Sequence, residues 1–174
     1  MKKNRFVALM TILIGIIWIC APVVTVSAET EHSLQVEATS YIVSSQWLPA
    51  GDEAGHVIGM TQREGEAIFS NGETAKYSTV STFDSRRSKG GTAQGYSKFA
   101  FDDGSLIVFS WISEIIRTQD GLPLNQGQGT IIKGTGRFEG IKGVSAFSGK
   151  QLKSVEDDTK LTSFQNATIT YTLP

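Results

Sequence analysis

Between residues 134 and 143 the chain reads GTGRFEGIKG, a glycine-rich stretch that lies between two segments of strand-like composition. No Gly-Lys-Ser or Gly-Lys-Thr follows it, and no helical period begins after it. This excludes a phosphate-binding P-loop and argues against a dinucleotide-binding loop. Glycines at close spacing among strands are typical of bulges, sharp bends and close backbone approach. Such features curl a sheet into a small barrel, so we expect this stretch to report on the fold.

Short strand-like segments follow one another along most of the chain, and none has a convincing amphipathic helical period. Alternating apolar and polar residues predict strands at 34–42, 56–60, 66–69, 74–83, 92–101, 105–112, 129–133, 140–147 and 164–173. Turns with glycine, such as Asn71-Gly72 and Asp103-Gly104, separate several of them. Eight or nine short strands fit an antiparallel sandwich or a barrel. We favour the barrel, because closure removes the edges that an all-β protein would otherwise expose.

Residues 1–28 have the three-part layout of a secretory signal peptide. Three basic residues precede an almost wholly apolar run from Phe6 to Cys20, Pro22 breaks the run, and small residues lead up to Ala28. Cleavage after Ala28 predicts an exported domain, periplasmic or extracellular, over residues 29–174. The alternative is an uncleaved N-terminal anchor, because the apolar run approaches the length that spans a membrane.

The predicted mature chain is a single, mildly acidic domain of 146 residues. Three of the 16 Lys and Arg residues lie in the predicted signal, so 13 remain against 17 Asp and Glu, a net charge of −4. This charge argues against nucleic acid and against an anionic membrane surface as partners. The one cysteine, Cys20, lies in the signal, which excludes disulfides and cysteine metal sites from the mature chain. We expect no metal, no cofactor and no stable membrane span after cleavage.

Three stretches together resemble the allene oxide cyclase-like barrels, a group that also contains the dirigent proteins. They are Gly136–Gly140, the pair Ile58–Met60 and Ala67–Phe69, and the turn with its following strand at Phe101–Leu106. The resemblance covers about residues 34–173 in similar order. It implies an eight-stranded up-and-down barrel with an apolar cavity. Known members cyclise or couple reactive apolar intermediates, and some related barrels catalyse cycloadditions. Members often form oligomers, which leaves a homo-oligomer open.

Two residues are candidates for catalysis. The plant cyclases of this family use a glutamate and an asparagine on the first strand, and Glu37 lies on the first predicted strand without a clear asparagine partner. His56 is the only histidine of the predicted folded body, at a strand start after Gly55, where it could act as a general base at a barrel rim. A structural or surface histidine is the alternative. Asp84, Arg86 and Arg87 fit an anion-binding rim, although we favour a solvated turn.

The aromatic residues are the stronger candidates for a binding site. Inward side chains of a small barrel either fill the lumen or line a cavity for a ligand. The four residues that we expect to contact a ligand lie on three consecutive predicted strands: Tyr77, Phe99, Phe109 and Trp111. Trp47, in a predicted loop, could cover one mouth, and Phe138 is expected to pack over the glycine backbone.

Three functions follow from these features. The first is a barrel that binds a small apolar molecule, which requires a dry cavity and no placed acid or base. The second is a cyclase or cycloaddition catalyst that holds a reactive substrate in a productive shape, with Glu37 or His56 to orient it. The third is a structural or protein-interaction barrel with a filled lumen. We favour binding, because no acid–base constellation stands out.

Overall fold

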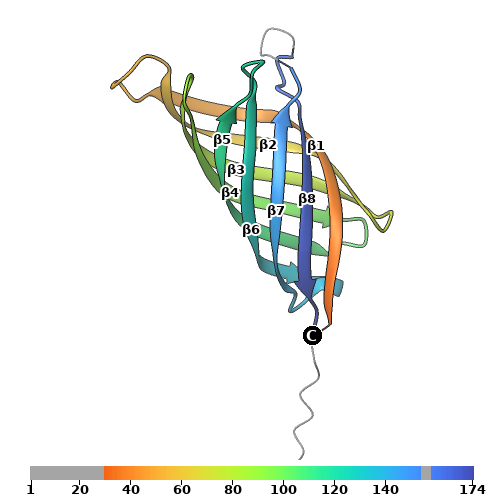
Figure 1. Cartoon of the computed structure of the whole chain (residues 1–174). Coiled ribbons are helices and arrows are strands. Elements are labelled where there is room, and N and C mark those ends of the chain that lie inside the picture. Colours follow the sequence, from red (N-terminus) through yellow and green to blue (C-terminus); the bar gives the residue numbers. More distant parts are fainter. Residues whose placement is uncertain (1–29, 154–157) are drawn as a thin grey trace, which may run out of the picture.

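Eight strands follow one another in the computed structural model, which describes residues 30–153 and 158–174 (Figure 1). Each strand pairs antiparallel with its neighbours in the chain, and β1 also pairs with β8, which closes the sheet into a barrel. The predicted signal peptide lies outside the described residues. The strands are β1 (Glu31–Pro49), β2 (His56–Phe69), β3 (Thr74–Arg86), β4 (Gly90–Phe101), β5 (Leu106–Arg117), β6 (Pro123–Thr135), β7 (Lys142–Gln151) and β8 (Ser163–Thr172).

The prediction of an all-β, eight-stranded up-and-down barrel is therefore confirmed, whereas several strand boundaries differ from the prediction. The segments predicted at 56–60 and 66–69 form one continuous strand, β2. β1 continues to Pro49, so Trp47 lies in a strand and not in a loop. β6 begins at Pro123, well before the predicted start at residue 129.

The split of β2 in the prediction has a physical reason. In the middle of β2, Thr61 and Arg63 line the lumen while Gln62 and Glu64 face outwards. Both faces of this stretch are therefore polar, so the alternation of apolar and polar residues that predicts a half-buried strand is missing. Inward polar residues are stable here because this half of the barrel contains a cavity and no apolar core.

The apolar core occupies the other half of the barrel, which we call the closed end. Phe69, Phe99, Phe101 and Phe109 form its aromatic centre, with ring centroids 5.2–5.8 Å apart in three contacting pairs. Such offset and edge-to-face pairs stabilise a core beyond their buried area. The other buried apolar residues of this core are Val36, Ala38, Ala67, Ala75, Tyr77, Ile107, Ile131, Phe138, Ile141 and Ile169.

The glycine-rich stretch forms the cover of the closed end. It links β6 to β7 through a single 3₁₀ turn, η1 (Gly136–Phe138), seen at the bottom of Figure 1. Gly136 and Gly140 have positive φ angles of 63° and 78°, which only glycine adopts at little cost. These two turns direct Phe138 into the core, where its ring centroid lies 5.0 Å from that of Phe101. The predicted packing role of Phe138 is confirmed.

Arg137 ties three turns together above Phe138. Its guanidinium lies 4.9 Å from the ring centroid of Phe101 and 4.7 Å from that of Phe138. It also forms ion pairs with Glu73 at 2.6 Å and with Asp103 at 3.4 Å. Glu73 belongs to the β2–β3 turn and Asp103 to the β4–β5 turn, so one cation joins three connections of the closed end.

Glycines on the inner face mark the places where neighbouring strands approach most closely. A Cβ atom on Gly65 would lie 1.9 Å from the carbonyl oxygen of Thr39 on β1. Similar overlaps with a neighbouring backbone oxygen, at 2.0–2.3 Å, occur at Gly91, Gly95, Gly127 and Gly143. The barrel wall therefore bends sharply at these positions, and the bend requires the absence of a side chain.

We expect Gly65→Ala to lower the free energy of unfolding by about 2 kcal/mol, because a backbone atom must move to admit the methyl group. Gly149→Ala is the matched control, since the nearest atom to its Cβ would be Cβ of Gln165 at 3.5 Å, an ordinary contact. Urea denaturation of both variants measures the difference. Equal stability of the two variants would contradict the close approach of β1 and β2 at Gly65.

Candidate functional site

A cavity of about 1340 Å³ fills the half of the barrel opposite the closed end and opens at its mouth. All eight strands contribute side chains to its wall, together with the loop at 51–55 and the loop at 121–122. Tyr77, Phe99, Phe109 and Ile169 belong to the apolar core and also face the cavity, so they form its floor. The lumen is therefore filled at one end and hollow at the other.

All four predicted ligand-contacting residues line this cavity. Tyr77 and Phe99 stack at 5.4 Å between centroids, and Phe99 meets Phe109 edge to face at 5.8 Å. Trp111 lies further towards the mouth, edge to face with Phe147 at 5.7 Å. The structure thus brings together on one surface the aromatic residues that the sequence only placed on neighbouring strands. Their contact with a ligand stays a prediction.

Small polar side chains form much of the wall above the aromatic floor. Thr61 Oγ1 and Ser81 Oγ lie 2.9 Å apart, and the Tyr77 hydroxyl lies 3.3 Å from both Ser97 Oγ and Gln165 Oε1. The resemblance implied an apolar cavity and gave no sign of this polar wall. A hint was present in the sequence, because Thr79 and Ser81 share the inward face of their strand with Tyr77.

Arg63 is a half-buried charged group of the cavity wall. From the sequence, Arg63, Glu64 and Glu66 fit a solvated turn, and this is wrong because all three lie within the continuous strand β2. The Nε of Arg63 donates to Ser40 Oγ at 3.3 Å, and its Nη2 donates to Ser163 Oγ at 2.7 Å. Nη2 also donates to the carbonyl oxygens of Ser40 and Leu161. Burial lowers the pKa of this guanidinium, against the smaller opposing effects of Tyr77 and Asp158. At neutral pH an arginine keeps its charge despite such a shift.

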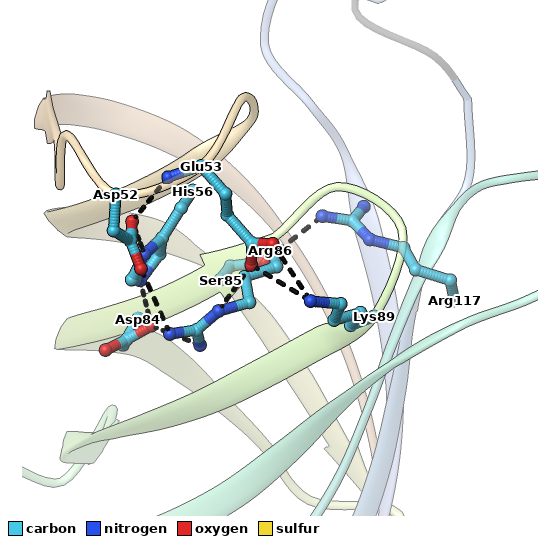
Figure 2. Close-up of polar contacts among 8 residues, drawn as sticks. All are labelled: Asp52, Glu53, His56, Asp84, Ser85, Arg86, Lys89 and Arg117. Atoms are coloured by element: carbon cyan, nitrogen blue, oxygen red, sulfur yellow. Dashed lines mark hydrogen bonds and ion pairs between the residues drawn. The ribbon is translucent and has the colours of Figure 1, made fainter.

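A second arginine, Arg117, lines the cavity from the end of β5 (Figure 2). Its Nη2 donates to Ser85 Oγ at 3.2 Å, while its Nε is buried without a hydrogen-bond partner among the described residues. Burial lowers the pKa of Arg117, and the nearby positive charge of Arg87 lowers it further. The cavity wall at Arg117 therefore carries positive charge that no described carboxylate pairs with.

His56 lies at the rim, held between two carboxylates (Figure 2). Its Nδ1 contacts Asp52, its Nε2 lies 2.8 Å from Asp84 Oδ1, and only 6% of the residue is exposed. The hydrogen bond with Asp52, followed by that with Asp84, raises the pKa of His56. Since both ring nitrogens face acceptors, the imidazolium form fits this position, and general-base chemistry would require one of the two bonds to break.

The same rim contains a small network of ion pairs that joins the β1–β2 loop to β3 and its turn. Arg86 Nε lies 2.8 Å from Glu53 Oε1, and Lys89 Nζ lies 2.9 Å from Glu53 Oε2. Asp84 and Arg86, predicted as a solvated turn or an anion-binding rim, therefore take part in a cross-link around His56. These contacts hold the loop at 51–55 against the cavity mouth.

Glu37 lies on the outer face of β1, because Val36 and Ala38 on either side of it are buried in the core. The structure does not bring Glu37 together with the other predicted site residues, and it is not part of the cavity wall. Alternation along a strand assigns neighbouring residues to opposite faces, so Glu37 and the cavity are separated by the barrel wall itself.

Within residues 30–153 and 158–174, none of the helical segments is long and apolar enough to cross a membrane. Nor do three or more His, Cys, Asp or Glu side chains gather there in a way that could hold a metal ion.

Comparison with known proteins gives similarity at the level of structure. No protein-family model matches the chain, and no curated protein matches its sequence. The pterocarpan synthase dirigent protein GePTS1 is 15% identical, with a TM-score of 0.45 over 89% of this chain and 97% of that protein. The pterocarpan synthase dirigent protein PsPTS1 is 14% identical, with a TM-score of 0.44 over 84% and 97%. These similarities concern the fold alone, and they agree with the resemblance to dirigent-like barrels predicted from the sequence.

Asp52 and Asp84 hold His56 between them, an arrangement that we call the His56 clamp, and it predicts that stability depends on pH. Because the folded-state pKa lies above the value of 6.5 for a free histidine, this contribution is fully present below about pH 6.5 and is lost as the pH rises through the raised pKa. The lowered pKa of Asp52 affects stability only in acid, below about pH 4. We expect the urea midpoint of the wild type to exceed that of His56→Gln more at about pH 6 than at about pH 9.

Asp84→Asn should flatten part of this dependence, because it replaces one of the two carboxylates that favour the imidazolium. A difference between wild type and His56→Gln that grew towards alkaline pH would contradict the clamp.

Proposed function

We propose that the barrel binds a small, largely apolar molecule in its cavity. The observation that carries this proposal is the position of Tyr77, Phe99, Phe109 and Trp111 on one concave surface open to solvent. Cavities that combine aromatic walls with a few polar groups are the usual form of a small-molecule site. The volume of about 1340 Å³, which includes the mouth, is ample for a ligand of several rings.

The closed barrel supports binding in a second way, because the site is largely formed in advance. Every strand that carries a cavity residue is hydrogen-bonded to two neighbours. The aromatic floor is also packed from below by the apolar core. A preformed site avoids the entropy cost of ordering loops and side chains on binding.

Binding is a better match to the cavity than acid–base catalysis. Among the described residues, the carboxylates that line it are Asp52 and Glu53, and both lie in the rim loop. Asp52 contacts His56, and Glu53 contacts Arg86 and Lys89. The groups deeper in the cavity are hydroxyls, amides and arginines, which orient a ligand more readily than they accept a proton from it.

Export of the barrel is part of the same proposal, on the basis of the layout of residues 1–28. Expression of the full chain in its own host should yield protein outside the cytoplasm whose first residue is Glu29. Mass spectrometry of the intact protein measures this. Cytoplasmic protein that retains Met1 would overturn export without affecting the cavity.

Trp111→Ala should weaken the binding of phenylnaphthylamine, an uncharged fluorescent aromatic probe, by about tenfold. The estimate assumes that the indole contributes about 50 Å² of apolar contact at about 25 cal/mol per Å². Ile112→Ala is the matched control, because Ile112 is the next residue of β5 and faces outwards with 57% exposure. Titration by fluorescence gives both affinities. Equal losses in the two variants, or no binding to the wild type, would refute the cavity as the site.

A further inference from the structure

Arg63 carries a buried positive charge that no carboxylate neutralises among the described residues. All of its hydrogen bonds go to uncharged oxygens of Ser40, Leu161 and Ser163. Asp158 influences it only at longer range, without an ion pair. By contrast, Arg86 pairs with Glu53 at 2.8 Å and Arg137 pairs with Glu73 at 2.6 Å. A largely desolvated charge without a counter-ion costs free energy, and an anion that bound beside it would offset that cost.

The guanidinium is held in one orientation with part of it free for a ligand. Nε and Nη2 make the hydrogen bonds to β1, to β8 and to Leu161 just before β8, whereas Nη1 makes none to the described residues. Arg63 lines the cavity, as do Thr61, Thr79 and Gln165 around it. A fixed guanidinium with unused N–H groups suits an oxyanion, since it offers charge-assisted hydrogen bonds without further ordering.

The charged side chains that line the cavity are mostly positive, as Arg63 is. Its lining residues include three arginines, Arg63, Arg87 and Arg117, and none of these forms an ion pair with a described carboxylate. The two acidic lining residues are already engaged at the rim with His56, Arg86 and Lys89. Arg87 is exposed, but Arg63 and Arg117 are half-buried, so the wall between them has an uncompensated positive potential that attracts and retains an anion.

Unsatisfied polar atoms on the opposite wall give independent evidence for a ligand with polar groups. Trp111 Nε1, Arg117 Nε and Asn125 Oδ1 are buried and have no hydrogen-bond partner among the described residues. All three belong to residues that line the cavity from β5 and β6. Buried donors and acceptors nearly always have hydrogen-bond partners in folded proteins, so a bound molecule or ordered water would supply the partners of these three atoms.

We infer that Arg63 binds the anionic group of the cavity's ligand, so that the ligand is an amphipathic organic anion. This inference rests on the proposed function and refines its ligand from an apolar molecule to an apolar body with one acidic group. The body packs on the floor of Tyr77, Phe99 and Phe109 and against Trp111. The acidic group, a carboxylate or sulfonate, meets the Arg63 guanidinium beside Ser40 and Ser163.

The competing explanation is that Arg63 only supports the barrel seam. β1 and β8 cease to pair beyond Ser40 and Ser163, and Arg63 bonds to both of these residues. A purely structural role predicts that removal of Arg63 affects all ligands equally, through stability or cavity shape. A ligand-binding role predicts a loss that is selective for anions.

Two fluorescent probes separate these explanations. Anilinonaphthalene sulfonate carries an anionic group that phenylnaphthylamine lacks, and the two share the same ring system. The measured quantity is the ratio of the Kd for phenylnaphthylamine to the Kd for the sulfonate, in the wild type, Arg63→Gln and Lys98→Gln. Lys98 lies exposed on β4 between the inward residues Ser97 and Phe99, so this control removes one positive charge from the outer face.

We expect Arg63→Gln to lower this ratio by about tenfold, equivalent to about 1.4 kcal/mol, and Lys98→Gln to change it less than about twofold. If Arg63→Gln fails to fold, Arg63→Lys is used in its place. This variant keeps the positive charge but loses the planar set of N–H donors, so it should lower the ratio of the two Kd values by a smaller factor. A ratio that is the same in the wild type and the folded Arg63 variant overturns the anion site. If the wild type does not bind phenylnaphthylamine, the proposed function itself is refuted.

Discussion

The pairing of β1 with β8 closes the barrel and thereby sets the positions of both its core and its cavity. It runs from Glu31 opposite Thr172 to Ser40 opposite Ser163, and it turns a sheet of eight strands into a closed wall. Closure forces every second side chain into a shared lumen. Beyond Ser40, β1 continues to Pro49 paired with β2 alone. The ladder between β1 and β8 thus ends at the level of Arg63, which bonds to both sides of it, and one backbone hydrogen bond, from Ile42 N to Lys160 O at 2.8 Å, continues the contact beyond it.

Closure also explains why the lumen has two different halves. At the closed end the aromatic cluster and Phe138, placed by the glycine-rich stretch, bury apolar surface and supply most of the hydrophobic stabilisation. At the open end Trp111 and Phe147 also point inwards, but many other inward positions carry Ser, Thr, Gly or Arg, which leave the space between the walls unfilled. Stability is thus concentrated at one end, and the other end is left to hold a ligand.

The rim and the interior of the open end also differ in charge. At the rim the charges are balanced, because His56, Asp52, Asp84, Arg86 and Glu53 satisfy one another (Figure 2). Inside the cavity, Arg63 and Arg117 face hydroxyl and carbonyl oxygens. The N–H donors of Trp111 and Arg117 that have no hydrogen-bond partner add to the positive potential there. A neutralised rim around a positive interior favours entry of an anion with an apolar body over a purely apolar molecule.

Strand alternation and turn chemistry are local properties, so the all-β class, the turns, the packing role of Phe138 and the shared face of the aromatic residues could be predicted from the sequence. The sequence also predicted two separate strands where β2 is continuous and too late a start for β6, since local alternation cannot show an inward face that is polar. The outward face of Glu37 follows from its alternation with Val36 and Ala38, whereas the contacts of His56 with Asp52 and Asp84 and the place of Arg63 in the cavity come from the closed barrel. The physical reason is register: closure brings Arg63 beside Ser163, 100 positions away in the chain, and no local pattern encodes that contact.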